Sequence, residues 1–179
     1  MRSSSVLLYI LCVITILFYG CGEKVQPSVS AVNSQSLPQQ ESWNSTITVS
    51  DSGHISAIIR AGYIRVYESS HITQMSEGVN VRFFNPQGIQ TSVLTSEEGS
   101  VDESTNNLEA RKNVVVVSSD SSRMTTEQLF WDNQRQLIHT QAYVQIDTKK
   151  ESLKGHGFES DQSLKNYRIF RVTGRTQTE

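Results

Sequence analysis

Apolar and polar positions change pattern twice along the chain. An apolar run over residues 6–21 ends in a glycine followed by Cys21, and a polar, irregular stretch comes after it. From Thr46 onward, short segments rich in Val, Ile, Thr, Tyr and Phe alternate with turn residues, which is typical of β-strands. The pattern predicts three parts: a signal peptide or membrane anchor over 1–21, a flexible linker over 22–45 and a β domain over 46–175.

Strand-like segments fill the third part, and no window sustains a helical apolar period. Turn residues such as the Asn-Pro-Gln-Gly of 85–88 separate them. The expected strands cover 46–50, 55–60, 63–68, 79–84, 90–95, 113–118, 128–132, 136–140, 143–148 and 167–173.

Alternation within these segments indicates which faces are buried. In residues 79–83 the odd positions are apolar and the even ones polar, so one face of this strand meets water. Val144 and Ile146 share a face in the same way, whereas 114–117 is apolar on both faces. Many short antiparallel strands with one apolar face predict a sandwich, a barrel or a jelly roll.

An internal repeat supports this interpretation. Residues 95–115 resemble residues 125–144, at an offset of 30 positions that becomes 29 after one deletion. A weaker copy runs over 61–81. A repeated strand-turn-strand unit predicts stacked hairpins that bury their apolar faces against one another.

The apolar run at 6–21 has two interpretations. A cysteine after a small residue at the end of such a run is typical of bacterial lipoproteins, which predicts lipidation at Cys21. Phe18 and Tyr19 are bulky for a cleavage site, so a retained single span is the alternative. Both interpretations export the rest of the chain and tether it to a membrane.

Charge and cysteine content restrict the exported part further. Arg2 is the one charged residue before Cys21, which leaves 15 basic and 18 acidic residues and a net charge of −3. This balance argues against binding to nucleic acid, which needs a concentrated basic surface. No cysteine follows Cys21, so disulfides, a thiol nucleophile and a thiolate metal site are excluded there.

Catalytic chemistry is not expected. His54, His71, His139 and His156 lie in separate segments without metal-ligand spacing, and no G-x-S-x-G elbow is present. We therefore predict a non-enzymatic protein with no cofactor and no metal. Trp131 is either a core aromatic or a wall residue of an apolar groove that takes a lipid chain, and Phe83, Phe130 and Phe158 carry the same two interpretations.

A family resemblance rests on the C-terminal half. It begins with three segments: Leu129-Phe130-Trp131-Asp132, Leu137-Ile138-His139-Thr140 and Tyr143-Val144-Gln145-Ile146. They are followed by a Gly-x-Gly-Phe turn at 155–158, by Asp161 and by a last strand that ends Val172-Thr173-Gly174. In this order and spacing the chain resembles the LptC family, the membrane-anchored periplasmic component of lipopolysaccharide export. The resemblance covers residues 51–174.

The resemblance implies a twisted, partly open antiparallel β-jelly roll of the OstA/LptA-like type. Its interior would receive the acyl chains of lipopolysaccharide from an inner-membrane Lpt ABC exporter and pass them to an LptA-like periplasmic bridge protein, on the periplasmic side of the inner membrane. The residues expected to line the interior are Val81, Phe83, Val115, Trp131, Ile146 and Phe158.

The resemblance also implies assembly through sheet edges, with the first strand facing the exporter and the last facing the bridge protein. The expected edge residues are Ile47 and Val49 in the first strand and Ile169 and Arg171 in the last. The alternative from the residues alone is a surface-exposed lipoprotein that binds glycan or protein through a closed β-sandwich.

Overall fold

The computed structural model describes residues 37–177, and all of its regular structure is β except for a single 3-10 turn, η2, at Glu68–Ser70. The predicted anchor and the lipid site at Cys21 lie outside these residues. The strands are β1 (Gln40–Asp51), β2 (His54–Tyr67), β3 (Ile72–Phe84), β4 (Gln90–Ser96), β5 (Glu98–Asp102), β6 (Asn107–Ser118), β7 (Arg123–Asp132), β8 (Leu137–Asp147), β9 (Glu151–Asp161) and β10 (Tyr167–Gln177).

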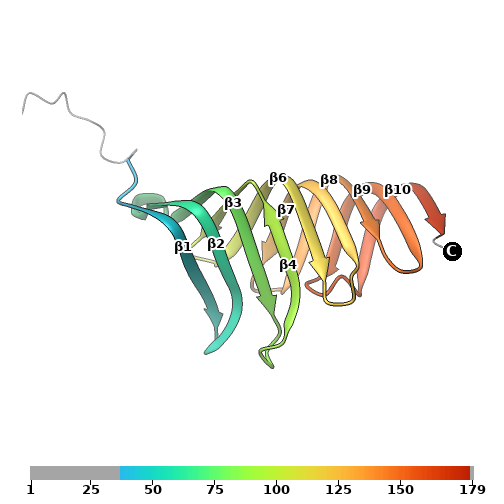
Figure 1. Cartoon of the computed structure of the whole chain (residues 1–179), viewed down its shortest axis with the longest axis horizontal. Coiled ribbons are helices and arrows are strands. Elements are labelled where there is room, and N and C mark those ends of the chain that lie inside the picture. The colour runs from blue at the N-terminus through green and yellow to red at the C-terminus, as the bar shows by residue number, and fades with distance from the viewer. Residues whose placement is uncertain (1–36, 178–179) are drawn as a thin grey trace, which may run out of the picture. The chain divides into compact units, whose positions relative to one another are not determined.

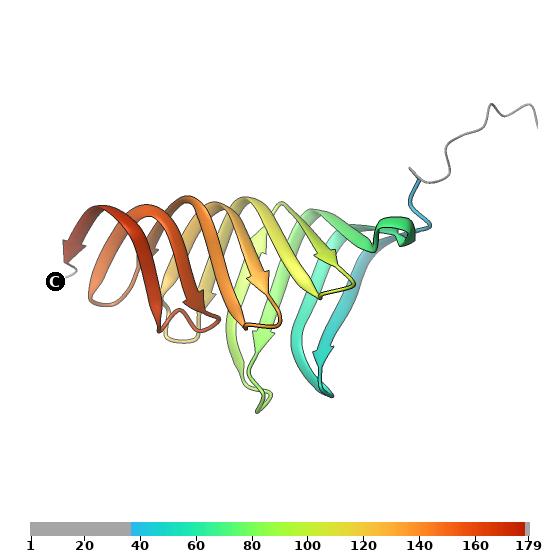
Figure 2. The same ribbon diagram turned by 180° about the vertical axis from the view of Figure 1, so that it is seen from behind.

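All strands belong to one antiparallel sheet with the order β1-β2-β3-β4-β6-β7-β8-β9-β10. The short strand β5 continues the line of β4 beyond Glu97 and pairs with β3 and β6. Within this β unit the strands lie side by side from β1 at one end to β10 at the other, and each curves over its length (Figures 1 and 2). The structure confirms the predicted all-β, antiparallel, jelly-roll-like class.

A bend crosses the middle of most strands. Pairing between β2 and β3 shifts register between Ala61 and Tyr63, and Glu77 and Gly78 on the facing strand have φ values of 61° and 86°. Gly62 is required there, because a Cβ atom would lie 2.6 Å from the carbonyl oxygen of Glu77. Bulges increase local bending and twist, so they fold the sheet over into two facing walls. The same kind of shift recurs in the β6–β7, β7–β8, β8–β9 and β9–β10 pairs.

These bends correct several predicted strand boundaries. The segments 55–60 and 63–68 form one strand, β2, and the segments 136–140 and 143–148 form β8. Irregular residues between them looked like turns in the sequence but are bulges that keep the strand paired. Strand β1 begins at Gln40 and not at Thr46, so the last residues assigned to the linker belong to the sheet.

Two strands were not predicted at all. Strand β5 is short and polar, and β9 contains the Gly-x-Gly-Phe sequence that we expected to form a turn. Gly157 instead marks the bend inside β9, with φ of 74°, and Phe158 continues the strand into the core. Glycine therefore serves as a bend in the middle of this strand and not as its end.

The repeat is present with a constant offset of 30 residues, and the predicted deletion is wrong. In the β5–β6 and β7–β8 hairpins, Asn106 and Gln136 close equivalent turns with φ values of 57° and 55°. The buried positions that follow correspond at the same offset: Leu108 with Ile138 and Val114 with Val144. Aligning Val114 with Tyr143 would place a buried residue opposite an exposed one.

Successive hairpin turns alternate between two ends of the folded sheet. We call the two sets rim A and rim B. Rim A consists of the turns at 52–53, 85–89, 119–122 and 148–150, and rim B of the turns at 68–71, 103–106, 133–136 and 162–166. The apolar core lies between the two walls, below both rims.

Candidate functional site

The interior between the two walls is the first part of the candidate site. It is formed by one continuous cluster of buried apolar side chains drawn from nine of the ten strands and from one turn. Phe83 of β3 and Trp131 of β7 meet there edge-to-face, with ring centroids 5.0 Å apart. These strands are not neighbours in the sheet, so the aromatic contact joins the two walls.

Most of the predicted interior residues are buried in this cluster. Val81, Phe83, Ile146 and Phe158 are fully buried, and Trp131 is 1% exposed. Phe158 also stacks on Tyr167 of β10, with ring centroids 6.3 Å apart. The alternation of apolar and polar positions therefore identified the inward faces of these strands.

Val115 is the exception, and its predicted interior position is corrected. Its neighbours Val114 and Val116 are buried, which places Val115 and the exposed Val117 on the outer face of β6. All four valines are apolar, so alternation could not decide which pair points inward. Val115 lines a shallow outer depression together with Tyr143 and other residues of β6, β7 and β8.

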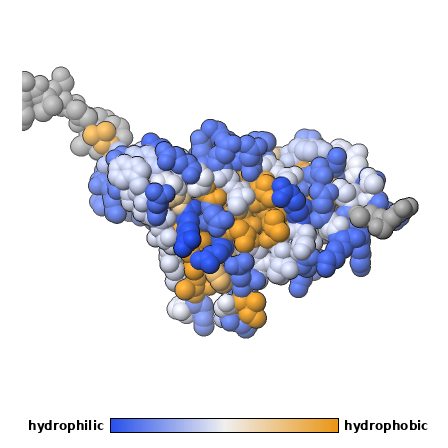
Figure 3. Space-filling view, in the orientation of Figure 1, coloured by the Kyte–Doolittle hydropathy of each residue, from blue (hydrophilic) through white to orange (hydrophobic). Residues whose placement is uncertain are grey.

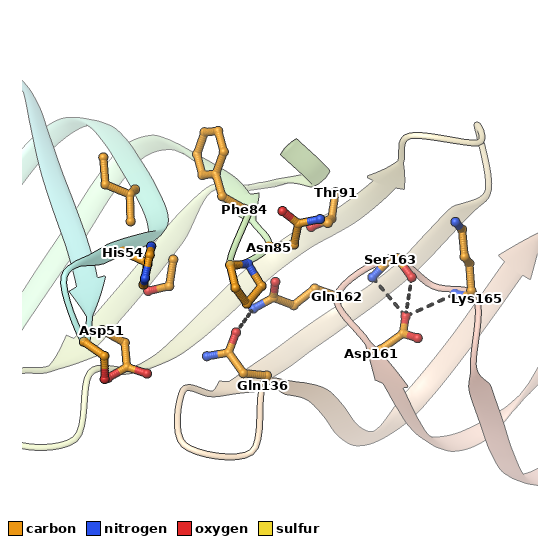
Figure 4. Close-up of a pocket in the computed structure, with 14 residues that line it drawn as sticks. Asp51, His54, Phe84, Asn85, Thr91, Gln136, Asp161, Gln162, Ser163 and Lys165 are labelled. Carbon is orange, nitrogen blue, oxygen red and sulfur yellow. Dashed lines mark hydrogen bonds between the residues drawn. The ribbon is translucent and has the colours of Figure 1, made fainter. Parts of the chain in front are cut away.

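A cavity of about 670 Å³ forms the second part of the candidate site. We call it the mouth cavity, because residues of both rims line it (Figure 4). The rim A side includes His54, Ile55 and Phe84, and the rim B side includes Gln136 and Gln162. The remaining lining residues are Asp51, Ser52, Ser56, Asn85, Pro86, Thr91, Asp161, Ser163 and Lys165.

Polar groups fix the rim B side of the mouth cavity. The Gln162 side-chain amide donates to Oε1 of Gln136 at 2.8 Å and ties two rim B turns together (Figure 4). Asp161 Oδ1 accepts from the backbone N–H of Ser163 at 3.0 Å, from its hydroxyl at 2.7 Å and from the backbone N–H of Lys165 at 3.2 Å, and Oδ2 accepts from Nδ2 of Asn166 at 2.6 Å. Burial raises the pKa of the Asp161 carboxyl, but the bonds from Ser163 and Asn166 outweigh burial, so the pKa is lowered.

Three buried polar atoms of the sheet interior have no hydrogen-bond partner within the described part of the chain. They are the hydroxyls of Ser92 and Ser160 and the indole N–H of Trp131. Ser92 and Ser160 are each adjacent in sequence to a cavity-lining residue, and Trp131 and Ser160 flank Ile138 in the same row of the sheet. A buried polar group that stays unpaired lowers the free energy of unfolding by about 1–3 kcal/mol. The closed interior therefore contains polar groups whose hydrogen bonds are not made.

The free edges of the sheet are the third part of the candidate site. Strands β1 and β10 each have one unpaired side, and both are long for edge strands. Of the predicted edge residues, Ile47 is half-buried and Val49 is 4% exposed, so both side chains point toward the core. Ile169 is half-buried, and Arg171 is exposed.

Exposed apolar side chains concentrate at these edges and at the tips of two hairpins. Trp43 is 62% exposed on β1, and Val172 is 54% exposed on β10. Ile55 and Ile89 are exposed at the tips of the β1–β2 and β3–β4 hairpins, where Figure 3 shows apolar surface. An unprotected edge with exposed apolar residues is a template for pairing with another strand.

Several titratable side chains of the described residues have a structural partner. Across residues 37–177 no three His, Cys, Asp or Glu side chains are grouped to hold a metal ion. His139 stacks on Phe130 at 5.5 Å, and His156 meets Tyr143 edge-on at 5.3 Å, so each has an aromatic partner on its neighbouring strand. The hydroxyl of Ser118 and groups of Ser122 hydrogen-bond Asp120 in a rim A turn and lower its pKa to about 2.

The mouth cavity was not predicted from the sequence. Gln136 and Gln162 are 26 residues apart and lie in turns with ordinary turn composition, so no local pattern indicates that they meet. The only available signal was the repeated turn, which predicts that equivalent turns stack at one rim. Within residues 37–177 no helix is long and apolar enough to span a membrane.

The family model described as "LptC: Lipopolysaccharide-assembly, LptC-related" matches residues 7–177. Among curated proteins, none matches the chain.

Proposed function

Since this chain belongs to the LptC-related family of lipopolysaccharide-assembly proteins, we propose that its β unit is a non-enzymatic carrier and scaffold for lipopolysaccharide. Membership gives the protein a part in lipopolysaccharide transport. The finer proposal is that the interior takes the acyl chains from an inner-membrane ABC exporter and passes them to a periplasmic bridge protein.

The apolar interior between two walls of a single sheet is the observation that carries this proposal. Among the described residues no charged side chain is fully buried, so the interior offers mainly apolar contact, with a few hydroxyl and amide groups. Burying each methylene group contributes about 0.8 kcal/mol, which is enough for acyl chains to bind without charged contacts. The rim residues around the mouth cavity supply amides and hydroxyls where a lipid headgroup would remain in water.

Site-specific photo-crosslinking in cells tests the carrier role. A photoreactive residue at Val81 or Ile146, which face the interior, is expected to capture lipopolysaccharide. Val115 is the matched control, because it is a valine on the same sheet that faces outward. Adducts at Val115 as strong as those at the inward positions, or none at any inward position, would contradict the proposal.

Strand addition at the two free edges is the proposed means of assembly. The edge of β1 would pair with the exporter and the edge of β10 with the bridge protein, so that the sheet continues from one domain to the next. Photoreactive residues at Trp43 and Arg171, both exposed, are expected to capture different partners. Deleting Tyr167–Glu179 should abolish binding to the bridge protein and leave membrane attachment intact; unchanged binding would contradict this assignment.

Attachment to the periplasmic side of the inner membrane is also proposed. The family is a periplasmic component of the export machinery. The anchor would be a lipid on Cys21 or a retained apolar segment, and the two differ in mass. Intact mass spectrometry of the membrane fraction is expected to show loss of residues 1–20 and added acyl chains if Cys21 is the anchor, and the full chain otherwise.

A closed β-sandwich that binds glycan or protein at its surface is the competing function. In such a protein the core around Phe83 and Trp131 would stay packed at all times. A carrier must open that centre. The inward crosslinking positions separate the two, because a permanently closed core never meets lipid.

A further inference from the structure

Leu164 has an unusual position for a turn residue. It lies in the β9–β10 turn of rim B, yet its side chain is 1% exposed and belongs to the apolar core cluster. It is the one member of that cluster that no strand contributes. A side chain from the rim therefore fills space between the walls.

The backbone conformation of Leu164 is held against its own preference. Its φ is 56°, in the left-handed region that leucine seldom adopts. Such a conformation is strained and persists only where the surroundings determine it. Here Asp161 determines it: the carboxylate accepts four hydrogen bonds from Ser163, Lys165 and Asn166, and the Asp161 carbonyl accepts from the Leu164 N–H at 3.2 Å.

The turn that carries Leu164 is also a wall of the mouth cavity. Gln162, Ser163 and Lys165, which flank Leu164, line the cavity, whereas Leu164 itself does not. The opposite wall includes the apolar side chains of Ile55 and Phe84 on rim A. Among the described residues, no hydrogen bond or ion pair joins Ile55 or Phe84 to the β9–β10 turn. The bond that movement of the turn must break or carry along is the one from Gln162 to Gln136 on the same rim, at 2.8 Å.

The interior beside this turn contains a buried polar group without a hydrogen-bond partner among the described residues. Ser160 comes one residue before Asp161, and its buried hydroxyl has no partner in the described part of the chain; the Trp131 indole N–H is in the same situation. Opening the turn would bring the Ser160 hydroxyl, which is next to it in sequence, toward water. The closed state therefore has a cost that opening relieves, in addition to the strain at Leu164.

We propose that the mouth cavity is the entrance by which an acyl chain reaches the interior, and that Leu164 is a plug which the chain displaces. The inference rests on the proposed carrier function and adds a site and a residue to it. The occupant is an acyl chain, because Leu164 is itself a member of the apolar core cluster and the space that it vacates is part of that core. Among the described residues no fully buried charged side chain lies there, and the one buried amide beside Leu164, that of Gln162, is paired with Gln136.

The plug predicts how binding responds to substitution. A closed turn lowers the fraction of molecules that can accept a chain, so removing the plug raises apparent affinity for the chain. Leu164→Gly removes the side chain and accepts the positive φ without strain. Asp161→Ala leaves Leu164 in place but removes the acceptor that holds the turn, so it should act in the same direction.

Photo-crosslinking of the full-length protein in cells tests the plug. The measured quantity is the ratio of lipopolysaccharide adduct at Ile146, inside the core, to that at Phe84, on the cavity wall. Leu164→Gly is expected to raise this ratio at least twofold. Gln134→Gly, at an exposed turn position of the same rim, controls for added glycine flexibility and should leave the ratio unchanged.

A second control separates a plug from a generally loosened core. Leu129→Ala removes a buried leucine on strand β7, and it should not raise the ratio. An equal rise in Leu129→Ala, or an unchanged ratio in Leu164→Gly while Ile146 still gives adducts, would overturn the plug and leave the carrier role standing. If Leu164→Gly does not accumulate in cells, Asp161→Ala decides by the same ratio. Absence of adducts at Ile146 in every variant would overturn the carrier function itself.

Discussion

The ring of Phe83 meets the ring of Trp131 at an interplanar angle of 68°, across the interior from one wall of the folded sheet to the other. In sequence the two residues are far apart, and their strands are separated by β4 and β6 in the sheet. The contact therefore forms only when the sheet has folded over. It is the most direct measure of whether the two walls are closed.

Replacing Trp131 by alanine is expected to destabilise the protein by about 3–5 kcal/mol, because the variant loses a large buried side chain and leaves a cavity. Phe83→Leu should cost less. A double-mutant cycle is expected to give about 0.5–1.5 kcal/mol of coupling for the aromatic pair. Urea unfolding followed by circular dichroism measures all four proteins; additive losses would mean that the rings do not interact.

Two glycines of the β9–β10 pair provide a matched test of packing. A Cβ atom on Gly155 would lie 2.3 Å from the carbonyl oxygen of Arg171 and 2.6 Å from a methyl of Ile169, so Gly155→Ala should push β10 away at a cost of about 1–3 kcal/mol. Gly174→Ala meets nothing closer than 3.8 Å and should be neutral within about 0.5 kcal/mol. Equal unfolding midpoints for the two variants would contradict this pairing.

The unpaired hydroxyl of Ser92 predicts an unusual outcome for a buried substitution. Ser92→Ala should leave the free energy of unfolding unchanged or raise it, because it removes a buried polar atom that has no partner in the described residues. Thr126→Val is the contrast: its hydroxyl donates to the Tyr143 carbonyl at 2.8 Å, so its loss should cost about 0.5–1.5 kcal/mol. A loss in Ser92→Ala as large as that in Thr126→Val would show that the hydroxyl is satisfied.

Asp120 predicts a pH dependence of stability. Its pKa in the folded protein is about 2, below the unfolded value of about 3.9. Its contribution is therefore complete above about pH 4 and is lost as the pH falls from 4 to 2. The decrease in urea midpoint between pH 6 and pH 3 should be smaller in Asp120→Asn than in the wild type. Parallel pH profiles for the two proteins would contradict this origin.

The pKa of Asp161 is shifted in the same direction as that of Asp120, and this shift has consequences for the β9–β10 turn. Its pKa is lowered in the folded protein, so protonation in acid weakens the bonds that hold the turn. Below about pH 4, amide hydrogen exchange at residues 163–166 is expected to accelerate before exchange in β7 and β8. Simultaneous loss of protection in all three segments would indicate global unfolding and contradict a separately mobile turn.

The sequence predicted which face of a strand is buried better than it predicted where a strand begins and ends. Alternation in residues 79–83 and 143–147 identified Val81, Phe83 and Ile146 as inward residues, because successive side chains of a strand point to opposite faces. It could not orient Val115, because an all-valine segment has no alternation to read. Bulges at Ala61–Tyr63 and Thr140–Tyr143 interrupt the pattern as turns do, so two long strands were each predicted as two short ones.

An all-β chain of repeated hairpins behind an apolar N-terminal segment, and the family to which it belongs, could be recognised from the amino-acid sequence alone. These properties follow from local composition, period and order. Three features emerge only in the folded chain: the sheet bends over itself, Phe83 reaches Trp131, and Leu164 enters the core from a rim turn. Those contacts join residues that are distant in sequence, and they depend on the register of many strand pairs at once, which no local pattern specifies.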